Sequence, residues 1–197
     1  MNMTLIYQVI EKELMNNLND LALKSVFKID ITKREKDKDY SLAIFQDTGI
    51  NEVDFLIETN IGEGIKPLAK VISGGEMSRV MLAIKALFIK AKKISTVIFD
   101  EVDTGISGEI ARKVALKIHD ISLTTQVISI THLPQVASLS THHIKIQKNV
   151  IKGRTYTEIK ELTLDEKIYE IASMISGGKV TESQLSYARE MVLNKEN

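Results

Sequence analysis

Two short apolar segments, separated by a helix-length stretch, constrain the fold of this chain more than any other feature. They are Thr96–Phe99 and Gln126–Ile130, and the stretch between them includes Gly108–Ile121, which has helical periodicity. Continuously apolar strands that alternate with helices are typical of parallel sheets covered by helices on both faces. We therefore expect an α/β fold in which these two strands lie parallel and buried in one sheet.

The first sixty residues have a different pattern. Apolar residues recur at helical spacing over Tyr7–Leu23, which predicts one amphipathic helix. Between residues 25 and 60 the apolar period falls to two, in three segments at 26–31, 42–45 and 53–57, which predicts an antiparallel β meander. The charged run at 33–39 is expected to be a solvated hairpin tip.

The last third of the chain predicts a hairpin and two helices. The strands are expected at 143–148 and 155–162, and the helices at 164–176 and 182–193. A glycine pair, Gly177 and Gly178, is expected to stop the first helix, and Thr181 with Gln184 to form a capping box for the second. His142 and His143 should point to opposite faces of a strand, a poor geometry for holding one metal ion.

These elements predict one lobe preceded by a helix. The helix occupies residues 1–24, and the lobe consists of the meander at 25–60, a core at 61–140, and the hairpin and terminal helices at 141–197. An apolar content of 44% over 197 residues is enough for such a core.

The overall charge and composition exclude several classes of function. Lys and Arg together number 26, as do Asp and Glu, so no net charge attracts nucleic acid. The chain has no cysteine, which excludes disulfides and thiolate metal sites and agrees with a reducing, cytosolic environment. We expect no signal peptide and no membrane span, because the opening residues lack a cleavage site and no apolar run is long enough.

A serine and two glycines precede the longest predicted helix of the core. Ser73, Gly74, Gly75 and Glu76 stand where the first backbone amides of a helix have no internal partner and the helix dipole is positive. Such an N-terminus suits a phosphate group. An ordinary N-cap is the alternative interpretation.

Two carboxylates follow the first core strand. In open α/β sheets the carboxyl ends of the strands are the usual ligand sites, and Asp100 and Glu101 stand at such an end. Asp100 is a candidate to hold Mg²⁺ through water, and Glu101 to polarise an attacking water molecule. A simple acidic turn is the alternative.

A histidine follows the second core strand. His132 comes two residues after Ile130 and two before Pro134, which is expected to begin a helix. A neutral imidazole at this end of the sheet is a candidate to hydrogen-bond a γ-phosphate oxygen or the attacking water. A capping or packing histidine is the alternative.

The order of these three features resembles the C-terminal half of ABC-type ATPase heads. The resemblance makes residues 73–76 the signature loop, Asp100 and Glu101 the Walker B pair, and His132 the switch histidine. The stretches KPLAKVISGGEMSRVMLAIKALF, VIFDEVDTGISGEIARKVA and ITHLPQVASLSTHH are similar to the RecN family of DNA repair proteins, in the SMC-like branch. By this resemblance Asp103 lies in the D-loop and contacts the nucleotide, and the first helix is the end of a coiled-coil arm.

The phosphate-binding Walker A loop of that family, G-x-x-x-x-G-K-[ST], is absent from this sequence. The resemblance therefore implies that ATP and Mg²⁺ are handled only with an N-terminal lobe of the same protein and a second head, and that this chain alone is inactive. It also implies a cytoplasmic, nucleoid-associated protein that reaches DNA through other parts. We expect the face that receives the missing lobe to be unusually apolar. An inert dimerisation or partner-binding fragment, another SMC-like head and a transporter head are the alternatives.

Overall fold

The computed structural model describes residues 3–33, 51–59, 62–71, 74–151 and 153–194. The chain divides into two compact units, residues 1–91 and 92–197, and each unit is described separately. Among the described residues, no helix combines the length and apolarity needed to cross a bilayer.

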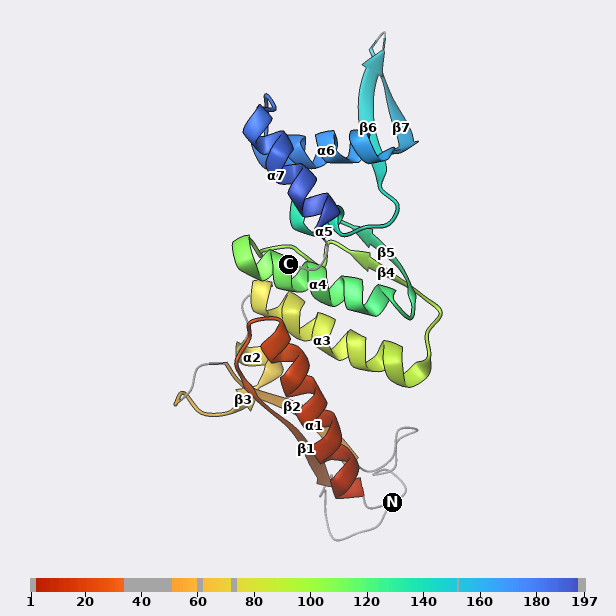
Figure 1. Cartoon of the computed structure of the whole chain (residues 1–197). Helices are drawn as coiled ribbons and strands as arrows, with labels where there is room; N and C mark the ends of the chain where they lie inside the picture. The colour runs from red at the N-terminus through yellow and green to blue at the C-terminus, as the bar shows by residue number, and fades with distance from the viewer. Residues whose placement is uncertain (1–2, 34–50, 60–61, 72–73, 152, 195–197) are drawn as a thin grey trace. The chain divides into compact units, whose positions relative to one another are not determined.

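The first unit contains a small antiparallel sheet and two long helices (Figure 1). Its elements are α1 (Met3–Asp20), β1 (Val26–Lys33), β2 (Asn51–Glu58), β3 (Lys66–Pro67), α2 (Leu68–Val71) and α3 (Gly74–Lys92). The sheet order is β1-β2-β3, with Phe27 opposite Ile57 in the core. β1 therefore pairs directly with β2. The segment with Leu42, Ile44 and Phe45, expected to form the middle strand of a meander, lies outside the described residues.

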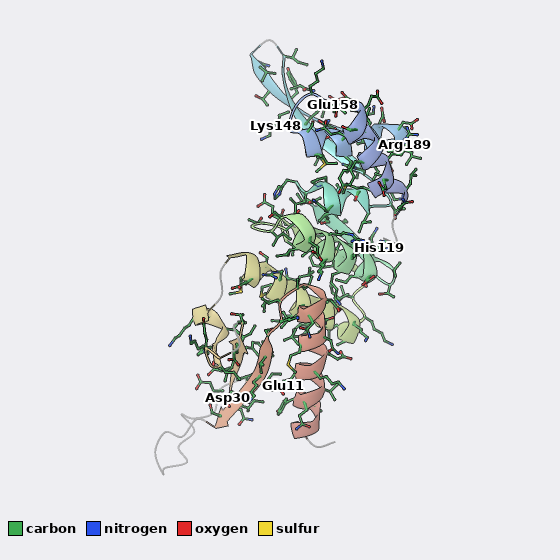
Figure 2. The ribbon with its side chains drawn as sticks, turned by 60° about the vertical axis from the view of Figure 1, so that its left-hand side comes forward. Glu11, Asp30, His119, Lys148, Glu158 and Arg189 are labelled. Atoms are coloured by element: carbon green, nitrogen blue, oxygen red, sulfur yellow. The ribbon has the colours of Figure 1, made fainter. Side chains whose placement is uncertain are left out.

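Helix α1 packs on the sheet through the apolar face that its periodicity predicts. Leu14 and Leu18 are fully buried, whereas Ile10 at the far end of the same stripe is 40% exposed. Glu11 accepts a hydrogen bond from the backbone amide of Ile29 on β1 at 2.8 Å, and Figure 2 labels Glu11 on the helix beside that strand. The helix is thus tied to the strand by a polar contact as well as by its leucines.

A left-handed residue ends helix α1. Ala22 has φ of 55°, and the amide of Leu23 donates to the carbonyl oxygen of Leu18 at 2.8 Å. The amide of Ala22 also donates to Asn19, at 3.0 Å, which completes a Schellman motif. The chain consequently turns sharply at this point and enters β1.

The second unit contains a parallel strand pair, a hairpin and four helices within its described residues (Figure 1). Its elements are β4 (Thr96–Asp100), α4 (Gly108–Ser122), β5 (Gln126–Ile130), α5 (Pro134–Ser138), β6 (Ile144–Ile151), β7 (Arg154–Glu161), α6 (Leu164–Ser176) and α7 (Glu182–Leu193). β4 and β5 are parallel and β6 and β7 antiparallel, which confirms the mixed α/β prediction.

Helices α5, α6 and α7 share an apolar core, and their ends follow the predicted signals. Pro134 begins α5. Gly177, with φ of 61°, ends α6, and the capping box of Thr181 and Gln184 begins α7. The core residues common to the three helices are Ala137, Ile168, Ile171, Ala172, Ala188 and Val192.

The expectation that β4 and β5 are covered on both faces is wrong for this chain. Phe99 is 1% exposed, but Ile98 is 61%, Ile128 48% and Ile130 51% exposed. The neighbouring helix α4 buries Ala111, Val114, Ala115 and Ile118, and its face can cover only one side of a two-stranded sheet. Within the described residues of this unit, the other side is an exposed surface formed by Ile98, Ile128 and Ile130, which we call the isoleucine face.

His143 makes this unit sensitive to acid. Burial lowers the pKa of His143 below its usual 6.5, and the nearby Lys167 lowers it further. The folded chain therefore binds a proton less readily than the unfolded chain, and the free energy of unfolding should fall as the pH drops below 6.5. We expect His143→Leu to reduce this slope in urea titrations from pH 7 to about pH 5. An unchanged slope in His143→Leu would contradict this expectation.

Candidate functional site

The carboxyl ends of β4 and β5 carry the predicted carboxylates and histidine. In the parallel register, Asp100 at the end of β4 lies opposite Ile130 at the end of β5. The pairing extends one residue further, because the amide of Glu101 donates to the carbonyl oxygen of Ile130 at 3.2 Å. Glu101 and His132 therefore leave the sheet at the same end.

Glu101 has a left-handed backbone conformation. Its φ is 48°, and its exposed side chain follows a buried strand residue, Phe99, by two positions. Its carbonyl oxygen accepts two hydrogen bonds from Thr104, one from the amide at 3.1 Å and one from the hydroxyl at 2.9 Å. A non-glycine residue in this region carries a conformational cost of about 1–3 kcal/mol, which the surrounding turn must offset.

We expect Glu101→Gly to raise the free energy of unfolding by about 1 kcal/mol, because glycine adopts this conformation without strain. The exposed glutamate side chain contributes little packing that would be lost. Urea denaturation checks the result. Asp100→Gly is the matched control, since it places glycine within β4 and should destabilise the chain by about 0.5–1 kcal/mol. A loss of stability in Glu101→Gly would contradict the strain argument.

Asp103 lies inside the turn and not on the surface. Its side chain is 1% exposed, and its Oδ2 accepts a hydrogen bond from the hydroxyl of Thr131 at the end of β5. The Thr131 hydroxyl oxygen also accepts from the amide of Leu133 at 3.0 Å. Asp103 thus joins the turn after β4 to the turn after β5 within this chain, and its predicted contact with a nucleotide stays a prediction.

His132 lies at the surface beside that buried carboxylate. Its side chain is 67% exposed, and its Nδ1 is 4.0 Å from Oδ1 of Asp103. The imidazole is therefore accessible to a ligand at the end of the sheet where Glu101 also lies.

The side chain of Asp100 suits the role predicted for it at a magnesium ion. Asp100 is exposed at the end of a strand and offers hard oxygen donors. Among the described residues, no three acidic, histidine or cysteine side chains cluster as a metal cage. Mg²⁺ commonly takes one or two carboxylates and fills its remaining positions with water and phosphate oxygens, so a single aspartate is compatible with it.

The predicted signature loop belongs to the first unit. Ser73 lies outside the described residues, and Gly74, Gly75 and Glu76 form the first turn of α3. A side chain added at Gly74 would meet no described residue within 4 Å. The first amides of a helix lack intrahelical acceptors, and this turn can therefore donate to an anion from outside.

Arg79 is a structural residue that the sequence patterns did not single out. It is 8% exposed on α3, and its guanidinium donates to the carbonyl oxygens of Leu21 at 3.2 Å and Ala22 at 3.0 Å. Its Nε donates to the carbonyl oxygen of Gly75 at 3.3 Å. One side chain thus supplies donors to two carbonyl oxygens after the end of α1 and also bonds the first turn of α3. No local signal in the sequence distinguishes it from a solvated arginine.

Sequence comparison finds close relatives of this chain among DNA repair proteins, although no family model matches. The chain is 51% identical over 144 residues to the DNA repair protein RecN of Bacillus subtilis, and the aligned region covers 73% of this chain and 25% of that protein. It is 48% identical over 148 residues to RecN of Halalkalibacterium halodurans, which covers 75% and 26%. RecN of Vibrio cholerae is 37% identical over 187 residues, covering 93% and 32%. The chain thus spans about a quarter to a third of these relatives.

Solved structures with a similar fold are heads of SMC proteins. The Smc head domain of Pyrococcus yayanosii has a TM-score of 0.61 at 18% identity, covering 83% of this chain and 28% of that one. A structure described under ATP-driven dimerization and DNA-stimulated activation of SMC ATPases has a TM-score of 0.59 at 17% identity, covering 88% and 95%. By sequence this chain is a homologue of the RecN DNA repair proteins, and its fold is that of SMC ATPase heads.

Proposed function

We propose that this chain is the C-terminal lobe of a RecN-like ATPase that acts in DNA double-strand break repair and recombination. In this proposal it supplies the signature loop at 73–76, the Walker B pair Asp100 and Glu101, and the switch residue His132. The observation that carries the proposal is the arrangement of Glu101 and His132 at one end of the parallel β4–β5 pair, linked by the 3.2 Å bond to Ile130.

The chemistry proposed for this end of the sheet is the attack of water on the γ-phosphorus of ATP. The bond between the γ-phosphorus and the bridging oxygen breaks, which yields ADP and inorganic phosphate. Glu101 orients the water and accepts its proton, and His132 hydrogen-bonds the water or a γ-phosphate oxygen. A magnesium ion, when bound through water at Asp100, supplies charge neutralisation for the phosphates.

The proposed partner for the isoleucine face is the N-terminal, Walker A-bearing lobe of the same protein. Ile98, Ile128 and Ile130 form an apolar surface of the kind that marks an interaction site. The chain has no G-x-x-x-x-G-K-[ST] loop, so it lacks the amides and lysine that hold β- and γ-phosphates. The exposed apolar face and the absent phosphate-binding loop are both explained if the N-terminal lobe binds the isoleucine face and supplies the Walker A loop.

A second head completes the proposed assembly. We infer that the signature loop of one head covers the nucleotide held by the other, in a homodimer. One of the solved SMC structures is described by its ATP-driven dimerization, which supports this arrangement for the present chain. DNA is proposed to reach the assembly through parts of the protein outside this chain, and a repair role assigns the protein to the cytoplasm, at the nucleoid.

The test is reconstitution with the Walker A-bearing segment of the 51% identical Bacillus subtilis relative. The chain alone is expected to hydrolyse no ATP and to bind it too weakly to saturate at millimolar concentration. The mixture should hydrolyse ATP, and the same mixture with the P-loop lysine changed to alanine should not. Stable binding of the two segments without hydrolysis would instead favour an inert dimerisation or partner-binding fragment.

A further inference from the structure

We propose that Asp103 is a positioning residue for His132. Its buried carboxylate accepts the Nδ1–H of the imidazole and thereby turns Nε2 toward the ligand side of the sheet end. The juxtaposition is direct, because Asp103 Oδ1 and His132 Nδ1 lie 4.0 Å apart, with the carboxylate 1% and the imidazole 67% exposed. Only the role of His132 in ATP hydrolysis rests on the proposed function.

The carboxylate of Asp103 has one oxygen bonded and one without a donor. Oδ2 is held by the hydroxyl of Thr131, whereas Oδ1 is buried and has no hydrogen-bond partner among the described residues. Burying an acceptor without a donor costs free energy, and it costs more when the acceptor is charged. The protein therefore gains free energy when a donor reaches this oxygen.

Two backbone amides of the same turn donate to acceptors other than Oδ1. The amide of Thr104 donates to the carbonyl oxygen of Glu101 at 3.1 Å, and the amide of Ile106 donates to the carbonyl oxygen of Asp103 at 3.4 Å. His132 offers a donor beside this oxygen, since its Nδ1 lies 4.0 Å from Oδ1 and its ring is exposed. A closer approach of about 1 Å brings Nδ1 within hydrogen-bonding distance of Oδ1.

This contact fixes which nitrogen of the ring carries the proton. When Nδ1–H donates to a carboxylate, Nε2 of the neutral ring is an acceptor and points away from the protein. A ring held in this way is ready to accept a hydrogen bond from water at Nε2, and in its protonated form to donate to a phosphate oxygen. A carboxylate that accepts a hydrogen bond from one ring nitrogen of a histidine commonly orients the ring in this manner.

The test is the tautomer of His132 in the whole 197-residue chain, measured without nucleotide. The chain is labelled with ¹⁵N in its histidines, and long-range ¹H–¹⁵N spectra are recorded at a pH at which the rings are neutral. His132→Asn identifies the resonances of His132 among the 4 histidines. In the unmodified chain we expect His132 to be the Nδ1–H tautomer. In Asp103→Leu we expect the Nε2–H tautomer instead.

Two further variants separate positioning from a general loss of structure. Glu109→Gln removes an exposed carboxylate of α4 that pairs with Lys113, and it should leave the tautomer unchanged. Thr131→Val removes the other hydrogen bond of Asp103, and it should keep the Nδ1–H tautomer. An Nε2–H tautomer in the unmodified chain overturns the proposal even if Asp103→Leu fails to fold, and so does an unchanged tautomer in a folded Asp103→Leu.

A second measurement relates the contact to turnover in the reconstituted ATPase. Asp103→Leu should lower kcat about 10-fold with the KM for ATP unchanged, because the ring still exists but is no longer oriented. In a chain that already carries His132→Gln, the same change should lower kcat no further. An equal loss in both backgrounds would mean that Asp103 acts on structure and not through His132. The tautomer is measured without ATP, so its outcome is independent of whether the proposed ATPase function holds.

Discussion

Glu101→Gln is expected to lower kcat of the reconstituted ATPase by about 10²–10⁴-fold, the usual contribution of a general base, while ATP still binds. Glutamine preserves the size and the left-handed backbone of this position but cannot accept a proton from water. Single-turnover assays with radiolabelled ATP measure the hydrolysis step, and filter binding measures retention of the nucleotide.

Glu109→Gln is the matched control for this experiment. It removes an exposed carboxylate on α4 without touching the end of the sheet, and it should leave kcat unchanged. Unchanged turnover in Glu101→Gln would show that Glu101 takes no part in hydrolysis. The turns after β4 and β5 would then have a structural role only.

Arg79→Met should lower the free energy of unfolding by about 2–4 kcal/mol. Methionine preserves the apolar stem of the side chain but removes the donors to Leu21, Ala22 and Gly75. The two carbonyls at the end of α1 would then be left without a donor, and the favourable placement of a cation at a helix C-terminus would be lost as well. Urea denaturation followed by circular dichroism gives the difference directly.

Arg112→Met serves as the comparison, because Arg112 is exposed on α4 and its replacement should cost less than about 0.5 kcal/mol. Arg79→Lys keeps the positive charge but has a single nitrogen, so it should recover only part of the loss. Equal stabilities of Arg79→Met and Arg112→Met would show that the buried guanidinium contributes little to the first unit.

Element positions in the second unit were predictable because their signals are local. The bounds of β5, α6 and α7 in the structure are those expected from periodicity, the αL glycine at Gly177 and the capping box at Thr181. Each of these signals is encoded within a few residues and can therefore be read without knowing the distant contacts. The same locality explains why β4 is predicted to within one residue.

Burial and side-chain environment were less predictable, because they depend on parts far apart in the sequence. The apolar composition of β4 and β5 indicated burial, but it did not indicate which polypeptide covers each face, and Ile98 is exposed here. The resemblance assigned Asp103 to a ligand, whereas its hydrogen bond to Thr131 joins residues 28 positions apart. The left-handed backbone of Glu101 likewise has no signature, since the side chain is not one that favours it.

The isoleucine face has a consequence for the life of such a chain in a cell. A folded polypeptide that displays Ile98, Ile128 and Ile130 to water offers the same apolar signal by which chaperones and proteases recognise incomplete folding. A copy in which those three side chains stay uncovered should therefore be degraded or sequestered. Covering of the isoleucine face would in this way protect complete heads and mark incomplete ones for removal.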